Sequence, residues 1–329
     1  MPGSSFQSDL LVLADADDAG VSRLVTSLAP RLGVAWWRFG LSEDSVSVQA
    51  DERGFQLEQP GTTLRSADLR DTPIVVHRRR LLQPRPLVTS ELTSPQDRGF
   101  SEREWTSLID GVLLDEERQS RSTWLNSPTA TLLTSNKLSL LLFAARTGVP
   151  VPSFSVSTPV CFPATGRGLV AKAISADERI DSSRHFSTAL LSPEDLHDLP
   201  GARTPTPSLL QEYVPASLEL RVFYALGEFL TLALTPCAEN VDIRHSTRAR
   251  LSPRPYDLPA DLCAALGGLA RAFALGYCTF DLVVPSDGPP ELVDITPNGD
   301  WDYFESDEAP MVTEFLADAI VARRAEIGR

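Results

Sequence analysis

The sequence has few of the residues that build zinc centres and disulfide frameworks. Its 329 residues include only four cysteines and four histidines. Neither set shows the close spacing that a zinc site requires, since the cysteines stand at positions 161, 237, 263 and 278 and the histidines at 77, 185, 197 and 245. The pattern argues against a zinc enzyme and predicts four buried free thiols.

Long apolar runs and an excess of positive charge are also missing. No stretch approaches the roughly 20 apolar residues of a membrane-spanning helix, and the N-terminus lacks the basic start and the apolar run of a signal peptide. A formal net charge of −14 argues against a general surface for nucleic acid or anionic membranes, although it leaves room for a local basic pocket. We therefore expect a cytoplasmic protein that binds neither nucleic acid nor membrane.

The composition is otherwise that of an ordinary globular protein. Hydrophobic residues make up 42% and charged residues 22% of the chain, which is long enough for two or three domains. In the first segment, residues 1–125, strand patterns alternate with helical patterns. Strands are predicted within 9–18, 34–40, 45–50 and 72–80, and helices within 19–33 and 101–119. This alternation predicts an α/β lobe.

Two further segments are predicted, 126–207 and 208–329. The second opens with a helix whose apolar positions are Leu138, Leu141, Leu142 and Ala145, and Gly148 is its expected C-cap. A strand around residue 172 and a polar loop over 192–208 follow. The third segment contains a hairpin turning at 227–228, a helix within 260–275, a second hairpin and a helix within 309–324.

The second hairpin brings two carboxylates together. An Asp-Gly pair at 287–288 separates two apolar runs, which is a strong hairpin signal. Folding symmetrically about that pair sets Asp281 opposite Asp294 and Thr279 opposite Thr296, with Cβ atoms of opposed residues about 5 Å apart. The opposite, apolar face is expected to hold Phe280, Leu282, Val284, Val293 and Ile295. Two facing carboxylates repel unless a cation lies between them, so the hairpin predicts a Mg²⁺ site; the alternative is a solvent-facing strand with two unrelated aspartates.

An ordered set of polar residues precedes and includes this pair, and each suits a nucleoside triphosphate. Two lysines from different segments can neutralise phosphates, and a strand crossing between lobes can offer backbone groups to a purine. Glu219 and Arg221 alternate onto one strand face, which places a carboxylate for ribose hydroxyls beside a guanidinium for the terminal phosphate. The full set is Lys137, Lys172, Gln211, Glu212, Tyr213, Val214, Glu219, Arg221, Asp281, Asp294 and Thr296. Taken singly, a lysine in a strand is more often an edge residue, and Glu219 with Arg221 fits a surface ion pair.

This order and spacing resembles the ATP-grasp superfamily, which has no glycine-rich phosphate loop. Four more motifs are similar to those of graspetide synthetases, the maturases that crosslink microviridin-like peptides. They are "VVHRRR" at 75–80, "WLNSP" at 124–128, "DIR" at 242–244 and "PNGDWDYFE" at 297–305. The resemblance implies an α/β (α+β) protein with an ATP-grasp fold and an N-terminal pre-ATP-grasp lobe. It also implies ATP and Mg²⁺ as cofactors, a homodimer, and a precursor peptide of leader and core as partner.

The resemblance further implies how the residues act. A side-chain carboxylate of the peptide attacks the γ-phosphate of ATP, and a Thr, Ser or Lys side chain of the same peptide then attacks the acyl phosphate, giving an ω-ester or ω-amide. Arg221, Asp242 and Arg244 are the expected catalytic residues, and Arg78, Arg79 and Asn298 are the expected peptide contacts. Without the resemblance, Asp242 and Arg244 fit an exposed loop pair, and the arginines fit the solvated end of an edge strand. Trp124 and Trp301 are expected to be packing residues.

The sequence departs from the family pattern at several positions. Asp294 and Thr296 stand where the superfamily has Glu-X-Asn, and a hydroxyl is a weaker metal ligand than an amide carbonyl. His77 replaces an aromatic residue, and Asp300 replaces a glutamine. Two alternatives therefore stay open: a free-standing ATP-grasp ligase for small carboxylates and amines, and a non-catalytic protein that binds nucleotide or peptide.

Overall fold

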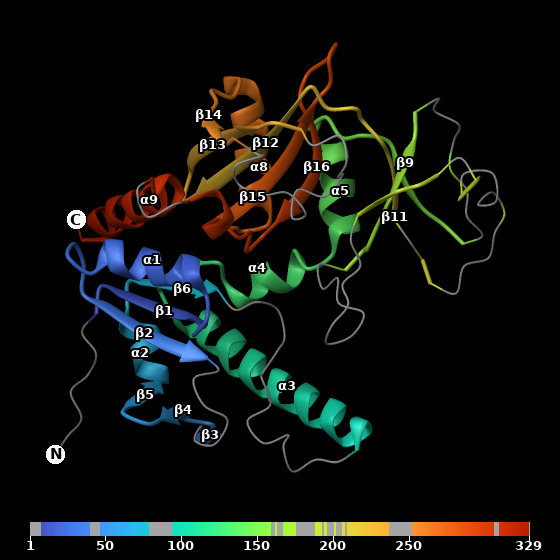
Figure 1. The fold of residues 1–329 in the computed structure, drawn as a ribbon. Coiled ribbons are helices and arrows are strands. Elements are labelled where there is room, and N and C mark those ends of the chain that lie inside the picture. The colour runs from blue at the N-terminus through green and yellow to red at the C-terminus, as the bar shows by residue number, and fades with distance from the viewer. Residues whose placement is uncertain are drawn as a thin grey trace. The chain divides into compact units, whose positions relative to one another are not determined.

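The computed structural model describes residues 8–39, 47–78, 94–158, 162, 167–175, 188–192, 194–195, 201, 206–207, 209–236, 252–305 and 309–328. The chain forms two compact units (Figure 1). Unit 1 comprises Met1–Leu132, Ala274–Tyr277 and Asp300–Arg329, and unit 2 comprises Leu133–Phe273 and Cys278–Gly299. The three segments expected from the sequence remain a prediction. No helix in the described part of the chain is long and apolar enough to span a membrane.

Unit 1 is built on a parallel sheet with strand order β2-β1-β6-β7. The strands are β1 (Leu10–Asp15), β2 (Val34–Phe39), β6 (Ile74–Arg78) and β7 (Thr123–Leu125), and the first three lie in predicted strand segments. The apolar residues of β1 are buried on both faces of the sheet, as parallel strands require. Helices α1 (Ala19–Leu28) and α9 (Met311–Ile327) lie side by side (Figure 1). The α/β lobe predicted from the sequence is confirmed.

Helix α1 ends earlier than the sequence pattern indicated. We expected it to run to Gly33, but it ends at Leu28 with Ala29 as C-cap. The reason is Pro30, which has no backbone N–H to donate to the preceding turn, so the regular helix hydrogen bonding stops there. Gly33 instead donates its backbone N–H to Asp9 Oδ2 at 2.9 Å.

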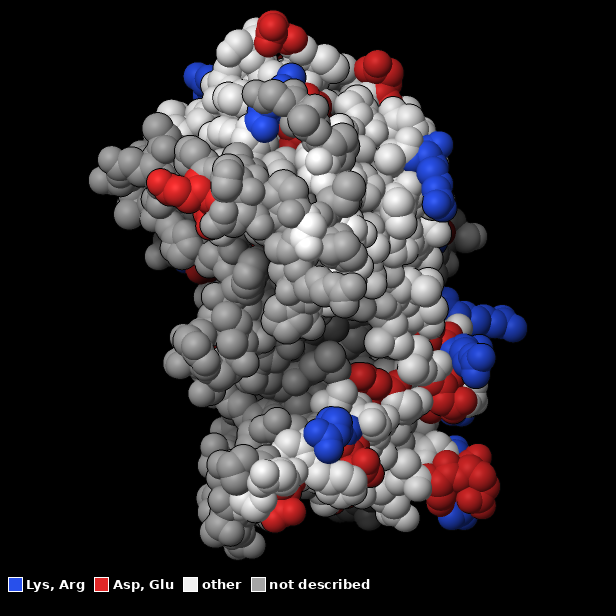
Figure 2. Space-filling model, turned by 90° about the vertical axis from the view of Figure 1, so that its right-hand side faces the viewer, with Lys and Arg blue, Asp and Glu red and all other residues white. Residues whose placement is uncertain are grey.

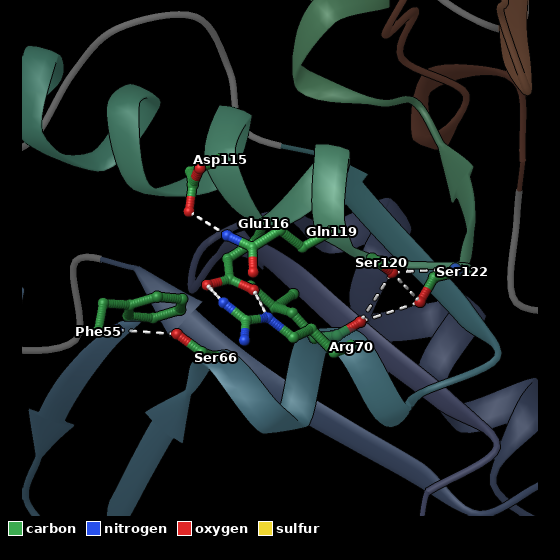
Figure 3. A network of polar contacts seen from close by, with 9 residues as sticks. Phe55, Ser66, Arg70, Asp115, Glu116, Gln119, Ser120 and Ser122 are labelled. Atoms are coloured by element: carbon green, nitrogen blue, oxygen red, sulfur yellow. Dashed lines mark hydrogen bonds and ion pairs between the residues drawn. The ribbon is translucent and has the colours of Figure 1, made fainter. Parts of the chain in front are cut away.

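A small antiparallel sheet and two helices complete the other side of unit 1. The sheet contains β3 (Ser47–Asp51), β4 (Gly54–Gln59) and β5 (Thr62–Arg65), and α2 (Ser66–Asp71) follows it; only β3 was predicted. Helix α3 (Pro95–Gln119) confirms the predicted helix and begins six residues earlier. Figure 3 shows Arg70 of α2 facing Glu116 of α3, with Nε–Oε2 and Nη2–Oε1 distances of 2.6 and 2.8 Å.

Unit 2 contains two sheets, of which the first is antiparallel with order β10-β9-β11-β8. Its strands are β8 (Phe154–Val156), β9 (Leu169–Lys172), β10 (Ala189–Leu190) and β11 (Leu209–Glu212). Helix α5 (Lys137–Arg146) was predicted, but with the wrong buried face, because Leu140, Leu141 and Ala144 are its buried apolar residues. The run of apolar residues from 140 to 145 fits either face, so periodicity alone does not settle the choice. Gly148, with φ of 81°, follows the helix end as expected.

The second sheet has strand order β14-β13-β12-β15-β16. The strands are β12 (Leu218–Ala225), β13 (Glu228–Leu234), β14 (Arg254–Pro255), β15 (Tyr277–Val284) and β16 (Glu291–Thr296), and α8 (Ala260–Ala272) is the predicted helix between them. The β12–β13 turn is one residue off the prediction. Its two residues are Leu226 and Gly227, with φ of 52° and 107°, because Ala225 pairs with Glu228. Positive φ at both positions is typical of a type I′ turn.

The β15–β16 hairpin has the predicted opposition of residues. Asp281 pairs with Asp294 and Thr279 pairs with Thr296. A register shift next to Asp281 pairs Leu282 with Leu292, so one residue, Val293, is extra in β16. Leu292 is therefore fully buried, and Val293, which we placed on the apolar face, is only half-buried.

Two short helices and the cysteines complete the description. Helix α4 (Pro128–Leu133) follows β7, and the 3₁₀ turn η2 (Asp302–Phe304) precedes α9. Cys278 is buried as expected, whereas Cys263 is only half-buried. Cys161, Cys237 and most of the expected loop at 192–208 lie outside the described residues.

Candidate active site

Unit 2 brings together four of the charged residues singled out in the sequence. Arg221 of β12 donates from Nη1 to both carboxylate oxygens of Asp281 on β15, at 2.6 and 2.6 Å. Lys137 of α5 donates from Nζ to Asp294 Oδ2 on β16, at 3.0 Å. Each of the two opposed carboxylates of the hairpin is therefore bonded to a cationic side chain. One of these side chains comes from helix α5 and the other from strand β12.

The start of helix α5 places Lys137 at the hairpin. Asn136 is the N-cap, and its side chain accepts from the Ser139 backbone N–H at 3.0 Å. The Lys137 backbone N–H donates to Ile174 O at 2.9 Å, which ties the helix start to the chain just beyond β9. From β9, Lys172 donates through Nζ to Val293 O at 2.8 Å. Both lysines therefore reach β16, and they are the only two lysines in the chain.

The charges alter the acidity of two carboxyl groups in opposite directions. Burial acts to raise the pKa of Asp294, but the ammonium groups of Lys137 and Lys172 outweigh it and hold that pKa below its usual value. Glu219 lies two residues before Arg221 on the same face of β12. Burial, helped by the negative charge of Asp281, raises the pKa of Glu219 to about 7. The site therefore contains one firmly ionised carboxylate and one that is poised to change its charge near neutrality.

The segment from 211 to 214 has a buried amide with no hydrogen-bond partner in the described structure. Gln211 on β11 is 1% exposed, and neither its Oε1 nor its Nε2 is bonded. The backbone N–H groups of Glu212 and Tyr213 are already used, by Ser153 O at 2.8 Å and Gly168 O at 2.7 Å. A purine at this segment would therefore meet backbone carbonyl groups and the N–H of Val214.

Three charged side chains lie close together at Glu212, the last residue of β11. Arg167 lies between two carboxylates, with Nε 3.7 Å from Glu212 Oε1 and Nη1 3.8 Å from Glu291 Oε1. Burial raises the pKa of Glu291; Arg167 opposes that shift and Glu212 adds to it. Neither Arg167 nor Glu291 was singled out in the sequence, because only the folded chain brings the residue before β9, the end of β11 and the start of β16 together.

In unit 1, Arg78 is buried among structural partners. It is 3% exposed, donates from Nε to Asp18 Oδ2 at 2.8 Å and donates from Nη2 to Asp300. Its guanidinium lies 4.2 Å from the ring centre of Trp301. Burial would lower its pKa, but Asp18, Tyr277 and Asp300 raise it above the usual value. The predicted contact of Arg78 with a peptide remains a prediction.

The motif that ends the hairpin is largely structural. Trp301 is 2% exposed, as expected of a packing residue, and its Nε1 donates to Thr313 Oγ1 at 3.1 Å. Glu305 accepts from the Thr313 backbone N–H and hydroxyl at 2.5 and 2.7 Å, at the start of α9. The acidic end of the motif therefore fixes a helix start. The sequence departure at Asp300 is explained in part, because this carboxylate pairs with Arg78.

The "WLNSP" motif also has a structural role that sequence reasoning missed. Trp124 is 8% exposed and packs edge-on against His77, with ring centres 6.3 Å apart, so its predicted packing role is confirmed. Asn126 is fully buried and bonds both backbone groups of Tyr277, donating to its O at 2.7 Å and accepting from its N at 2.8 Å. The two residues are 151 positions apart, so sequence spacing gave no signal of this link.

The turn after β16 leaves no room for a side chain at Gly299. A Cβ on Gly299 would lie 2.2 Å from Thr279 Oγ1, so no larger residue fits there without movement. Asn298, next to it, is half-buried, as is Thr296. Three predicted site residues, Arg79, Asp242 and Arg244, lie outside the described residues. The contacts of these three side chains remain predictions.

A divalent metal at the hairpin would have few ligands from the protein. Within the described ranges, no three His, Cys, Asp or Glu side chains gather as a metal site. Mg²⁺ is commonly held by one or two carboxylates together with phosphate oxygens and water. Asp281 and Asp294, with the hydroxyl of Thr296, fit that pattern when a phosphate supplies the remaining oxygens. On the face shown in Figure 2, the acidic and basic side chains of the described residues lie in small mixed groups.

Comparison with known proteins identifies the fold. No protein-family model matches the chain, and no curated protein sequence matches it. Among solved structures, the macrocyclase MdnC of Microcystis aeruginosa MRC, bound with precursor peptide MdnA, has a TM-score of 0.75 and 21% identity, covering 95% of this chain and 99% of MdnC. The ATP-grasp ligase PsnB, complexed with minimal precursor, Mg and ADP, has a TM-score of 0.71 and 19% identity, covering 96% of this chain and 97% of PsnB.

A more distant structure gives the same result. D-alanine–D-alanine ligase of Bacillus anthracis, complexed with ATP, has a TM-score of 0.54 and 10% identity, covering 97% of this chain and 98% of that ligase. The TM-scores establish a shared fold, and the coverage extends it over nearly the whole length of the chain. The fold predicted from the sequence is confirmed: the chain has the ATP-grasp fold, in the form also found in peptide macrocyclases.

Proposed function

We propose that the protein is an ATP-dependent ligase that crosslinks a ribosomally made precursor peptide. The observation that carries the proposal is the pair of opposed aspartates, Asp281 and Asp294, each bonded to a cation in one unit of the ATP-grasp fold. The chain also shares nearly its whole length with MdnC, which was solved with a precursor peptide. In the proposed reaction, an Asp or Glu side chain of the peptide is activated by ATP and then joined to a Thr, Ser or Lys side chain.

The residues fit a nucleotide at the adenine end. A buried polar group without a partner costs about 1–3 kcal/mol, and both polar atoms of the Gln211 side chain are in that condition. A glutamine amide can bond the N6 and N7 atoms of adenine at the same time. Backbone carbonyls at Glu212 and Tyr213 and the Val214 N–H would complete the contact with the base, and Glu219 would accept from the ribose hydroxyls.

The residues also fit the phosphate end. Lys137, Lys172 and Arg221 supply three positive charges around the hairpin. Asp281, Asp294 and Thr296 would hold Mg²⁺, which offsets the negative charge on the phosphate oxygens. PsnB was solved with Mg and ADP, which supports both cofactors.

The chemistry requires two anions to approach each other. When a peptide carboxylate attacks the γ-phosphorus, the P–O bond to ADP breaks and an acyl phosphate forms. Arg221 and the lysines stabilise the charge on the transferring group. Arg244 would hold the carboxylate or the acyl phosphate through paired hydrogen bonds, and Asp242 would accept the proton of the attacking hydroxyl or amine. Phosphate then leaves, and the ester or amide bond remains.

The proposal extends to the peptide contacts and to the assembly. We assign Arg79 and Asn298 to contacts with the leader or core of the peptide, and we expect a cytoplasmic homodimer. The N-terminal segment, residues 1–125, would contribute peptide or subunit contacts, the segment 126–207 the lid over the nucleotide, and 208–329 the catalytic face. Arg78 is bonded to Asp18 and Asp300. It could contact the peptide only if an acidic group of the peptide replaced one of these two aspartates.

A mass measurement tests the proposal. The purified protein is incubated with ATP, Mg²⁺ and the precursor peptide encoded beside its gene. Loss of one water mass per crosslink, abolished by Asp294→Ala and by Arg244→Ala, is the expected result. ATP use with free amino acids and an unchanged peptide would instead identify a small-molecule ligase, an alternative that the similarity to D-alanine–D-alanine ligase supports. Neither product nor ADP would identify a non-catalytic binding protein in which Thr296 has weakened the metal site.

A further inference from the structure

Strand β16 contains one residue more than its pairing with β15 uses. Asp294 pairs with Asp281. Leu292, two residues earlier in β16, pairs with Leu282, which is the very next residue of β15, so Val293 is left over. Such a bulge leaves the extra residue outside the ladder, and bulges are common next to active sites, where they redirect single groups. This bulge lies directly before Asp294, one of the proposed metal ligands.

The bulge redirects the carbonyl group of Val293. The Leu292 N–H donates to Pro150 O at 2.7 Å, so it points away from β15. The backbone groups of successive residues in a regular strand alternate between its two edges, so a regularly paired residue 293 would turn its carbonyl toward β15. Val293 O instead accepts from Lys172 Nζ, at 2.8 Å. The extra residue therefore supplies an acceptor for a side chain outside the hairpin.

Lys172 is the residue whose ammonium group this carbonyl binds. The lysine is the last residue of β9, in the other sheet of the same unit, and it is 7% exposed. A lysine side chain has many rotamers, and fixing one of them costs conformational entropy. An ammonium group has three donors, so a bond to Val293 O is compatible with a bond to a phosphate. A lysine that is already fixed in the free protein loses less entropy when the nucleotide binds.

We infer that Val293 is a positioning residue, whose carbonyl group is turned outward by the bulge and fixes the Lys172 ammonium group for the phosphates of the nucleotide. This role rests on the proposed function, in which Lys172 binds those phosphates, and it adds a residue that acts through its backbone alone. A regular hairpin would also set Asp281 opposite Asp294. It would, however, turn the carbonyl group at position 293 toward β15 and away from the lysine.

Deletion of Val293 tests this role, because it converts the bulged hairpin into a regular one. Asp294 can stay opposite Asp281, Leu292 can stay opposite Leu282, and only the extra residue is lost. The probe is the non-hydrolysable ATP analogue AMPPNP, titrated calorimetrically into the full-length protein with Mg²⁺. We expect the deletion to weaken AMPPNP binding about 3- to 10-fold, which is the effect of one long side chain that must be immobilised on binding.

A double-mutant cycle shows whether the loss of affinity acts through Lys172. In a Lys172→Met background the deletion of Val293 should cause no further loss, because no ammonium group remains to be positioned. Deletion of Ser286, in the exposed turn of the same hairpin, is the matched control and should leave the AMPPNP affinity unchanged, since it keeps the bulge. An equal loss in the Lys172→Met background would overturn the inference, because a general distortion of the hairpin does not depend on the lysine.

A spectroscopic measurement on the wild type decides the question even if the deletion variant fails to fold. Lys137 and Lys172 are the only lysines in the chain, so lysine labelled with carbon-13 and nitrogen-15 gives two sets of side-chain signals, and Lys172→Met assigns them. Without nucleotide, we expect the end of the Lys172 side chain to have an NMR order parameter above about 0.6, the value below which a group is flexible. The order parameter should fall below that value in the deletion variant.

The outcomes separate this role from the proposed function. A flexible Lys172 in the nucleotide-free wild type, or undiminished AMPPNP binding by the deletion variant, would overturn the positioning role alone. Failure of the wild type to bind AMPPNP with Mg²⁺ would instead overturn the proposed function.

Discussion

Replacing Glu219 by glutamine should stabilise the protein at neutral and alkaline pH but not at acidic pH. Burial and the nearby charge of Asp281 raise the pKa of this carboxyl from 4.5 to about 7. Below the unfolded value both states are protonated and the carboxyl has no effect on the free energy of unfolding. Between the two values the unfolded state releases its proton while the folded state keeps it, so stability falls as pH rises. Each pKa unit corresponds to about 1.36 kcal/mol, so the full cost above the folded pKa is about 3 kcal/mol.

The assay is denaturant unfolding of the wild type and of Glu219→Gln near pH 5 and near pH 8. Glutamine has no charge to bury, so the stability gained by the variant should grow by about 2–3 kcal/mol between the two pH values. Glu228→Gln, which removes an exposed carboxylate from the neighbouring strand β13, should show no such growth. A gain that is equal at both pH values, or that shrinks as pH rises, would refute the assignment of a raised pKa to this group.

Three further substitutions test the packing and the site. Arg70→Ala leaves the buried carboxylate of Glu116 without its partner (Figure 3) and should lower the free energy of unfolding by about 3–5 kcal/mol in a denaturant titration. Gly299→Ala forces a Cβ against Thr279 Oγ1 at 2.2 Å, so we expect a loss of about 1–3 kcal/mol together with reduced crosslinking in the mass assay. Lys172→Met removes one of the charged donors at β16 and should weaken AMPPNP binding about 10- to 100-fold by calorimetry, as loss of a hydrogen bond from a charged group predicts.

Matched variants define what would contradict each expectation. Arg31→Ala breaks an exposed pair with Asp318, whose side chain is 70% exposed, and should cost less than about 1 kcal/mol; an equal loss for Arg70→Ala would contradict a buried-charge penalty. Gly111→Ala, inside helix α3, adds a Cβ that has nothing within 4 Å, so it should raise the free energy of unfolding. A similar gain for Gly299→Ala would contradict the expected steric clash. Undiminished AMPPNP binding by Lys172→Met would show that Lys172 does not contribute to nucleotide binding.

The sequence predicted the hairpin opposition because its signal is local. An Asp-Gly turn and two apolar runs set Asp281 against Asp294, and the structure has that register. The extra residue at Val293 was not predictable, because the alternation of apolar residues tolerates a bulge without any change of residue type. The buried face of α5 was missed for a related reason, since a continuous apolar run offers two faces of similar character.

The pairing of charges could not be derived from spacing. Lys137 is 157 residues from Asp294 and Arg221 is 60 residues from Asp281, and only the folded chain brings each pair together. Arg78 illustrates the same limit, because its strand pattern allowed either a peptide contact or a solvated strand end and gave no sign of its ion pairs with Asp18 and Asp300. Motif order nevertheless identified the fold, since that order follows the chain through both units. The division into three segments and the roles of Asp242 and Arg244 remain predictions.

The most direct test of the central claim follows the oxygen of the peptide carboxylate. A precursor peptide labelled with oxygen-18 in its Asp and Glu side chains is incubated with the enzyme, ATP and Mg²⁺, and the released inorganic phosphate is analysed by mass spectrometry. Activation through an acyl phosphate predicts one labelled oxygen in the phosphate for every crosslink formed. Crosslinked peptide accompanied by unlabelled phosphate, or by AMP carrying the label, would contradict the account.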